Sequence, residues 1–407
     1  MSYPYRSAFF DRLGVRSWIN ASNWSTSLGG TYLDPEVVEA MRDVSQSFVD
    51  MHELNQKAGE RVAELCKVDA AIITTGAAAG IYLATAACIA GTDQAKWDRL
   101  PHTDGMRNEV IMHRGHVCGY EHQYTAAGAQ LVLLDQPLHP STTLHAAYEQ
   151  AITDRTASIA CIHSYKARTK GMLPFEQVVK LAKVHGVRTQ LDAAALVPPV
   201  ANLHKYTDMG FDLVVLSGGK GIRGPQNTGL ILGGGEKGRE LIDAIRRNTS
   251  PNHGLGRPLK VSKEAIAGLV TALERFTAKG REEEEYQQQM GKAEHLVLEL
   301  RDIPHVDVTI IPNDGVHFEH PMQPRVPRVQ LAIDTHALGL TLPDIHKAMA
   351  ADDPPIKLRP EFAYYDHSAF TSHSTLLIDT YFLRDGEETL VAARLRKVLT
   401  KNKARIN

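Results

Sequence analysis

A lysine that directly follows an apolar strand pattern is the residue of this chain best placed to do chemistry. Lys220 comes after the apolar run Leu213–Leu216, Ser217 and two glycines. Open α/β folds bind ligands at the carboxyl ends of their strands, and glycines let the backbone approach a ligand closely. A Walker nucleotide-binding loop requires Ser or Thr after its lysine, and Gly221 stands there instead. The pattern therefore favours a lysine that forms a Schiff base over a phosphate-binding lysine, with a surface turn as the structural alternative.

An acidic residue ends a second strand pattern. Asp192 follows Thr189-Gln-Leu and precedes three alanines. A carboxylate at a buried strand end needs a cationic partner, and a protonated pyridine nitrogen would serve. Pyridoxal phosphate requires this pair of residues: a lysine for its aldehyde, and an acid that keeps the ring an electron sink. The alternative is an aspartate that caps the next turn.

Two further motifs suit the same cofactor. Ile73–Gly80 runs from a strand into a helix of small residues, whose first backbone N–H groups would bind a phosphate. Gly76, Ala77 and Ala78 would form this cup, although close helix–sheet packing produces the same composition. Ser217 could add a hydroxyl group to the cup.

The third motif is His113-Arg-Gly-His116, which follows the strand pattern Glu109–Met112. An imidazole here could lie on the cofactor ring, and His116 is preferred over His113. A metal site is not expected, because no third ligand arrives at a recognisable spacing.

The elements that must position these residues follow a βαβ rhythm. Seven strands are expected at Ala70–Thr74, Glu109–Met112, Gln130–Leu134, Ser158–His163, Arg188–Leu191, Asp212–Leu216 and Gly229–Leu232. Several are apolar on both sides, as in a parallel sheet covered by helices on both faces. After about residue 256 the pattern changes to long amphipathic helices and shorter strands. We therefore predict an N-terminal segment 1–50 that joins a small lobe, a large α/β domain 51–256 and a small α+β domain 257–407.

The composition excludes several classes of protein. The 407 residues are 43% hydrophobic and carry a formal net charge of −2, which argues against nucleic-acid and membrane-surface partners. No apolar run reaches the roughly 18 residues of a membrane helix. The first residues lack the layout of a secretion signal, and the four cysteines are scattered singly. We expect free thiols and a cytoplasmic location.

Taken in chain order, the motifs resemble the fold type I pyridoxal-phosphate enzymes, within the branch of selenocysteine synthase and D-glucosaminate-6-phosphate ammonia-lyase. The resemblance covers nearly the whole chain. It rests on Ile19-Asn-Ala-Ser22 with Leu28-Gly-Gly30, Lys57-Ala-Gly-Glu-Arg61, Thr75-Gly-Ala-Ala-Ala-Gly80, His113-Arg-Gly-His116 and, most specifically, Ser217-Gly-Gly-Lys-Gly-Ile-Arg-Gly-Pro-Gln226. It implies an aspartate aminotransferase-like α/β fold, with a mostly parallel doubly wound sheet and a smaller α+β C-terminal lobe.

The resemblance also assigns roles to the site residues. For the cofactor these are Lys220 at the aldehyde, Asp192 at the pyridine nitrogen, Gly76, Ala77, Ala78 and Ser217 at the phosphate, and His116 over the ring. For the substrate it implies Arg359 as carboxylate ligand. Trp24 interrupts the run of small residues expected after Ser22, and with Ser25 it is a candidate for the pocket wall. Further basic candidates around the cofactor entrance of this or a neighbouring subunit are Arg257, Arg223 and Lys263. A guanidinium suits a carboxylate because it binds through two parallel hydrogen bonds.

Two departures separate the chain from selenocysteine synthase. Asn20 lies too near the start to leave room for a tRNA-handling region, and Gly219 stands where those enzymes read Asp. We therefore expect a lyase that takes the α-proton of a small, β-hydroxy or phosphorylated amino acid and releases a 2-oxo acid and ammonia. A racemase or epimerase, an aldolase and a cofactor-binding protein without turnover stay open. Fold type I sites are completed between subunits, which implies at least a homodimer and no nucleic-acid partner.

Overall fold

The computed structural model describes residues 3–135, 143–163, 172–311, 326–359 and 374–400. The described residues form two compact units, a larger one of Thr31–Lys279 and a smaller one that combines the residues up to Gly30 with the described residues from Gly280 onward. The units divide at other residues than the predicted limits 50/51 and 256/257, because α2 (Pro35–Ser45) packs against α11 (Lys263–Phe276).

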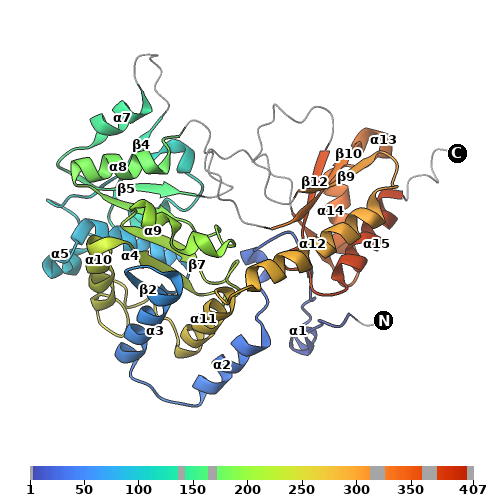
Figure 1. The fold of residues 1–407 in the computed structure, drawn as a ribbon, viewed down its shortest axis with the longest axis horizontal. Helices are drawn as coiled ribbons and strands as arrows, with labels where there is room; N and C mark the ends of the chain where they lie inside the picture. The colour runs from blue at the N-terminus through green and yellow to red at the C-terminus, as the bar shows by residue number, and fades with distance from the viewer. Residues whose placement is uncertain (1–2, 136–142, 164–171, 312–325, 360–373, 401–407) are drawn as a thin grey trace. The chain divides into compact units, whose positions relative to one another are not determined.

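A seven-stranded sheet organises the larger unit (Figure 1). In spatial order its strands are β2 (Ala70–Thr74), β8 (Gly229–Gly233), β7 (Leu213–Ser217), β6 (Arg188–Asp192), β5 (Thr156–Ile162), β3 (Glu109–His113) and β4 (Gln130–Leu134). Strands β3 to β7 pair in parallel, whereas β8 runs antiparallel to both its neighbours. The seven predicted strands and the mostly parallel, doubly wound sheet are confirmed.

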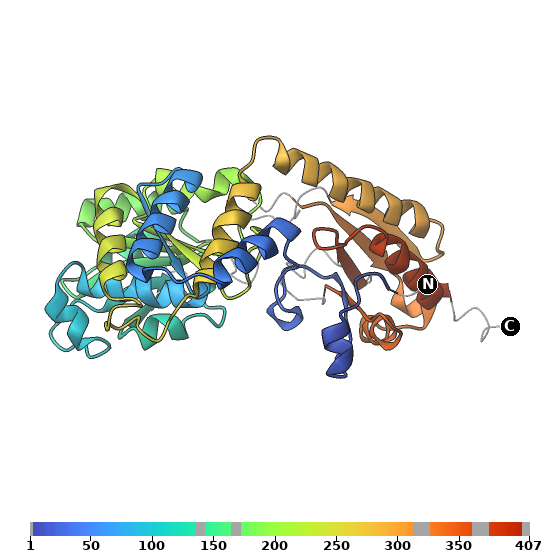
Figure 2. The same cartoon turned by 90° about the horizontal axis from the view of Figure 1, so that it is seen from below.

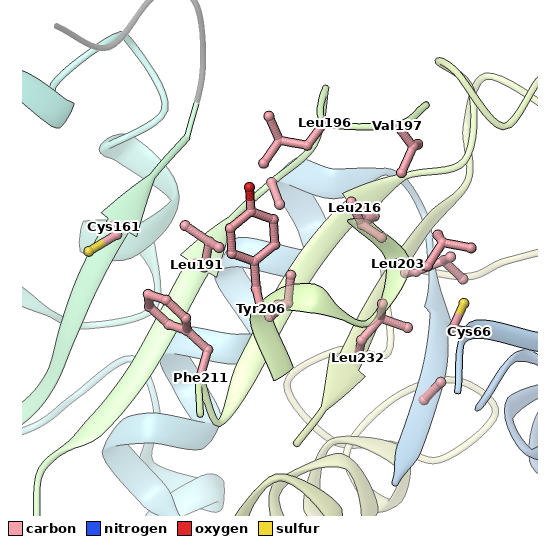
Figure 3. Packing of buried hydrophobic residues seen from close by; sticks show 14 of the residues in the cluster. Cys66, Cys161, Leu191, Leu196, Val197, Leu203, Tyr206, Phe211, Leu216 and Leu232 are labelled. Carbon is pink, nitrogen blue, oxygen red and sulfur yellow. The ribbon is translucent and has the colours of Figure 1, made fainter. Parts of the chain in front are cut away.

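Helices cover both faces of this sheet, because successive side chains of a strand point to opposite faces. On one face, α3 (Met51–Cys66), α8 (Phe175–His185), α9 (Lys205–Met209) and α11 pack on a cluster that includes Leu191, Leu216 and Leu232 (Figure 3). On the other face lie α4 (Ala77–Ala90), α6 (His122–Ala126) and α10 (Gly235–Arg247). The unit also contains α5 (Gln94–Arg99) and α7 (Leu144–Ala151).

Helix α4 packs on the central strands of the sheet. Ten of its residues are buried, since it is apolar all round, as expected of a helix inside a core. At Gly80 an added Cβ would lie 2.7 Å from Val215 Cγ1 of β7. Gly80, the last residue of the predicted phosphate motif, is thus required by packing, whereas a Cβ at Gly76 would meet no neighbour. The close packing at Gly80 brings the start of α4 onto the sheet edge.

The smaller unit is an α+β structure around its own core. Strands β12 (Ser374–Asp379), β10 (Arg328–Ile333) and β9 (Val306–Ile311) form an antiparallel sheet, and β1 (Ile19–Ala21) pairs in parallel with β11 (Ile356–Leu358). Its helices are α1 (Ala8–Arg12), α12 (Arg281–Leu300), α13 (Thr335–Leu338), α14 (Leu342–Ala351) and α15 (Glu387–Thr400). The long α12, orange in Figure 2, packs on α15 and β9. Within the described ranges of the whole chain, no helix is long and apolar enough to cross a membrane.

Candidate active site

The carboxyl edge of the large sheet collects the main predicted site residues. Asp192 is the last residue of β6 and lies in register with Val215 of β7. β7 ends at Ser217, and Lys220 follows in the next loop. Because β6 and β7 are parallel neighbours, both strands deliver their functional groups to the same edge.

The Asp192 carboxylate is buried, with 5% of the residue exposed. Its Oδ1 accepts a hydrogen bond of 2.9 Å from the backbone N–H of Ala194. Burial raises the pKa of this carboxyl, while the Ala194 N–H and the positive charge of Lys220 act in the opposite direction. The Lys220 amine therefore lies within electrostatic reach of the carboxylate, and the structure brings the two residues together.

The start of α4 and Ser217 meet over β8. Gly229 lies in register with Ser217 on one side and with Thr74, the last residue of β2, on the other. A Cβ added at Gly229 would lie 2.7 Å from the backbone nitrogen of Ala77, so the helix terminus sits directly on this residue. The first N–H groups of a helix have no carbonyl partner within it. The Ser217 hydroxyl group and the N-terminus of α4 thus lie close together at one end of the site.

The glycines of the lysine loop are required by the loop's own packing. An added Cβ would lie 2.4 Å from the Gln226 Cα at Gly219, and 1.9 Å from the carbonyl oxygen of Val197 at Gly221. Neither position has room for a side chain. The sequence pattern predicts glycines that admit a ligand, whereas in the structure they let the loop fold tightly and hold Lys220 in place.

His116 lies beside the strand that neighbours Asp192. It is 2% exposed, and its Nδ1 lies 2.9 Å from the carbonyl oxygen of Ile162, the residue paired with Asp192. Its ring stacks on Phe175, with 6.5 Å between centroids. His113 instead accepts a hydrogen bond from the Gly115 N–H at its Nδ1, and burial lowers its pKa. Of the two histidines, His116 is therefore the one that contacts β5 at the residue paired with Asp192.

Tyr124 of α6 is a neighbour of the site that the sequence analysis missed. It is 1% exposed, and its pKa is raised first by burial and next by the negative charge of Asp192. The phenol therefore lies near the carboxylate, on the face of the sheet that α4 covers. A tyrosine on a five-residue helix has no sequence motif, so only the fold reveals it.

Three of the residues predicted to bind the substrate belong to the smaller unit. Trp24 is buried and packs edge-on against Tyr381 and Phe382, with centroid distances of 5.7 and 6.2 Å. The Ser25 hydroxyl lies 2.8 Å from that of Ser27. Arg359 is buried and its backbone bridges to Leu377 of β12.

The other basic candidates lie in the larger unit, in different surroundings. Arg257 follows α10, and its backbone N–H bonds to Gly254. The Lys263 amine bonds to the Ser45 carbonyl and to Glu264, so it ties α11 to α2. Arg223 lies in the lysine loop itself. Among the described residues, no group of three or more His, Cys, Asp or Glu side chains is arranged to hold a metal ion.

The known proteins similar to this chain are named as different enzymes. The chain is 32% identical to a 5'-C-glycyluridine monooxygenase-decarboxylase of Streptomyces sp, over 96% of this chain and 92% of that protein. It is 28% identical to the D-glucosaminate-6-phosphate ammonia lyase of Salmonella typhimurium, over 96% and 97%. A solved structure of D-glucosaminate-6-phosphate ammonia-lyase superposes with a TM-score of 0.78 at 26% identity, covering 97% of this chain and 98% of that one.

These similarities confirm two predictions, the aspartate aminotransferase-like fold and the branch to which the motifs pointed. The family model of L-seryl-tRNA selenium transferase, SelA, matches residues 23–290, which include the lysine loop and the strands around it. The chain belongs to the SelA family.

Proposed function

We propose that this chain is a pyridoxal-phosphate-dependent lyase that acts on a β-hydroxy amino acid, with a phosphorylated amino sugar acid as the favoured substrate class. The observation that carries the proposal is the buried Asp192 carboxylate within electrostatic reach of Lys220 at the ligand-binding edge of the sheet. Full-length similarity to an ammonia lyase of that substrate class supports it.

The described residues fit the cofactor. Asp192 accepts one hydrogen bond, at Oδ1, from the described part of the chain, which leaves Oδ2 available for the pyridine nitrogen. The Ser217 hydroxyl makes no hydrogen bond to the described residues, and it adjoins the N-terminus of α4. A hydroxyl group and helix N–H groups are the donors that a phosphate requires. Lys220 would hold the aldehyde, and His116 would flank the ring.

The bound cofactor would supply an electron sink that stabilises a carbanion at the substrate's α-carbon. Asp192 keeps a proton on the ring nitrogen, because a carboxylate in a site without water strongly favours a cation beside it. The Lys220 amine would be the base that takes the substrate's α-proton. The substrate-binding roles of Arg359, Trp24, Ser25 and Arg257 are part of this proposal and rest on the resemblance.

The overall reaction balances without an added oxidant. The α-proton and the β-hydroxyl group leave as water, and the resulting enamine takes up one water molecule. The net products are a 2-oxo acid and ammonium. Lys220 would pass the α-proton to the departing hydroxyl group, so the chain ends the cycle unchanged.

A second function is favoured by one observation. The monooxygenase-decarboxylase of Streptomyces has the higher identity of the two full-length relatives, 32% against 28%. Such a reaction also begins from an amino acid and differs in consuming oxygen and releasing carbon dioxide. Oxygen consumption therefore separates the two functions.

The first prediction concerns the products. The purified holoenzyme, given D-glucosaminate 6-phosphate, should release 2-oxo acid and ammonia in equal amounts with no oxygen uptake. A dehydrogenase-coupled ammonia assay and an oxygen electrode measure both. Oxygen uptake with carbon dioxide release from an amino acid substrate would establish the second function, and loss of chirality alone would indicate a racemase.

The second prediction concerns Asp192. Burial gives the Asp192 carboxyl a higher pKa in the folded apoprotein than in the unfolded chain. The free energy of unfolding therefore decreases as the pH rises from the unfolded-state pKa to the folded-state pKa, and it stays at the lower value above that pH. Asp192→Asn should therefore raise the midpoint of thermal unfolding of the apoprotein at pH 8 but not at pH 4. It should weaken cofactor binding roughly 10- to 100-fold, as expected when a hydrogen bond to a charged group is lost.

Asp212→Asn is the matched control. Asp212 is also a largely buried carboxylate with a raised pKa, but it precedes β7 at the opposite end from Ser217 and accepts hydrogen bonds from Thr189. Its substitution should leave cofactor affinity unchanged. Equal cofactor affinity in the Asp192 variant and the wild type would contradict the role of Asp192.

We also propose that the chain acts as a homodimer or a larger homo-oligomer. Phe48, between α2 and α3, is fully exposed, and Val38 and Val49 are about half exposed, so these apolar side chains are available for contact with a second subunit. Analytical ultracentrifugation should show a dimer or larger, and a monomer at micromolar concentration would contradict this. The cytoplasmic location stays a prediction from the sequence.

A further inference from the structure

A second cation shares the loop that carries Lys220. Arg223 comes three residues later, and its backbone N–H donates a hydrogen bond of 3.0 Å to the Lys220 carbonyl. This turn brings the backbone of Arg223 back beside that of the lysine. Arg223 is 8% exposed, so its charge is held within the larger unit and not in bulk water.

The backbone of Arg223 has a conformation that suits glycine better. Its φ is +59°, in the left-handed region that residues with a Cβ enter at a cost. The cost persists because the loop around it cannot relax: Gly221 abuts Val197, and the Gly224 N–H bonds to the Gly218 carbonyl. A strained residue that the surrounding structure holds in place is a reason to look for a function in its side chain.

The Arg223 side chain is oriented by an aromatic ring. Its guanidinium carbon lies 5.2 Å from the centroid of Tyr32 in the same unit. Stacking of this kind uses the flat face of the guanidinium, whereas its N–H groups point outward in its plane. A planar fork fixed in this way is suited to two parallel hydrogen bonds with an oxyanion.

We infer that Arg223 binds an oxyanion of the substrate, its carboxylate or its phosphate. The inference rests on the proposed function, because it assumes that the substrate reacts at Lys220. It assigns substrate recognition to the lysine loop itself, in the same unit as Asp192. An arginine at this position would then be kept, despite its strained backbone, because its side chain binds the substrate.

The alternative is a structural one, in which the stacking of Arg223 on Tyr32 only anchors the segment before α2. The two readings predict opposite effects for Arg223→Gly. Glycine adopts the observed backbone without strain, so an arginine retained for binding can be replaced with no loss of stability. A structural arginine cannot.

Lys67→Gly is the matched control. Lys67 is also a cationic residue with a left-handed backbone, at φ +57°, but it is exposed and ends α3. Both glycine variants should keep or raise the midpoint of thermal unfolding. Only Arg223→Gly should weaken substrate binding, by roughly 10- to 100-fold, as expected for a lost charge-assisted bidentate contact. Arg223→Lys should recover part of this loss.

Binding is measured from the early change in cofactor absorbance, with D-glucosaminate 6-phosphate and with D-glucosaminate. Weaker binding of the phosphorylated compound only identifies the phosphate as the partner, and equal weakening of both identifies the carboxylate. Either result supports the inference. Unchanged binding in Arg223→Gly, or a lower unfolding midpoint without a change in binding, overturns it.

The proposed function can fail separately, if the wild type acts on neither compound. Calorimetric titration of inorganic phosphate into the holoenzyme then tests Arg223 alone. Weaker phosphate binding in Arg223→Gly than in Lys67→Gly supports the oxyanion site, and equal binding in the two variants contradicts it.

Discussion

The larger unit depends on one constraint, a carboxylate kept out of water at the end of β6. A buried charge is costly unless an opposite charge lies near it, and the burial of Asp192 raises its pKa despite the nearby Lys220. The parallel pairing of β6 with β7 is what brings the two groups to one edge. Helix α4, packed closely on the same sheet, brings its N-terminus to that edge as well. The apoprotein thus holds an unfavourable arrangement that a cationic ring nitrogen would relieve.

Much of this arrangement could be predicted from the sequence, because it depends on strand ends. Buried parallel strands are read from continuous apolar runs, so the positions of Asp192 and Lys220 followed from where those runs stop. The reason assigned to the glycines did not hold. Gly219 and Gly221 are required by contacts with Gln226 and Val197, which are close in the fold and invisible as a pattern. The glycine content predicts a tightly folded loop, but it does not predict which residues that loop packs against.

Other features depend on tertiary contacts and could not be predicted. The antiparallel direction of β8 follows from its short connection to β7, which leaves no room for a crossover helix. Tyr124 lies within electrostatic range of Asp192 and belongs to a short helix that has no periodicity to detect. The roles of Arg359 and Trp24 in the smaller unit stay predictions, because the resemblance alone connects them with the reaction. The two full-length relatives are named for different reactions, so the cofactor is easier to infer than the reaction.

The central claim is that Lys220 holds the cofactor's aldehyde next to Asp192, and one measurement tests it most directly. The holoenzyme is reduced with sodium borohydride, digested, and mapped by mass spectrometry. The account predicts one reduced pyridoxyl phosphate per chain, attached to the peptide that contains Lys220. Attachment to another lysine, or no attachment in protein that has been loaded with the cofactor, would contradict it.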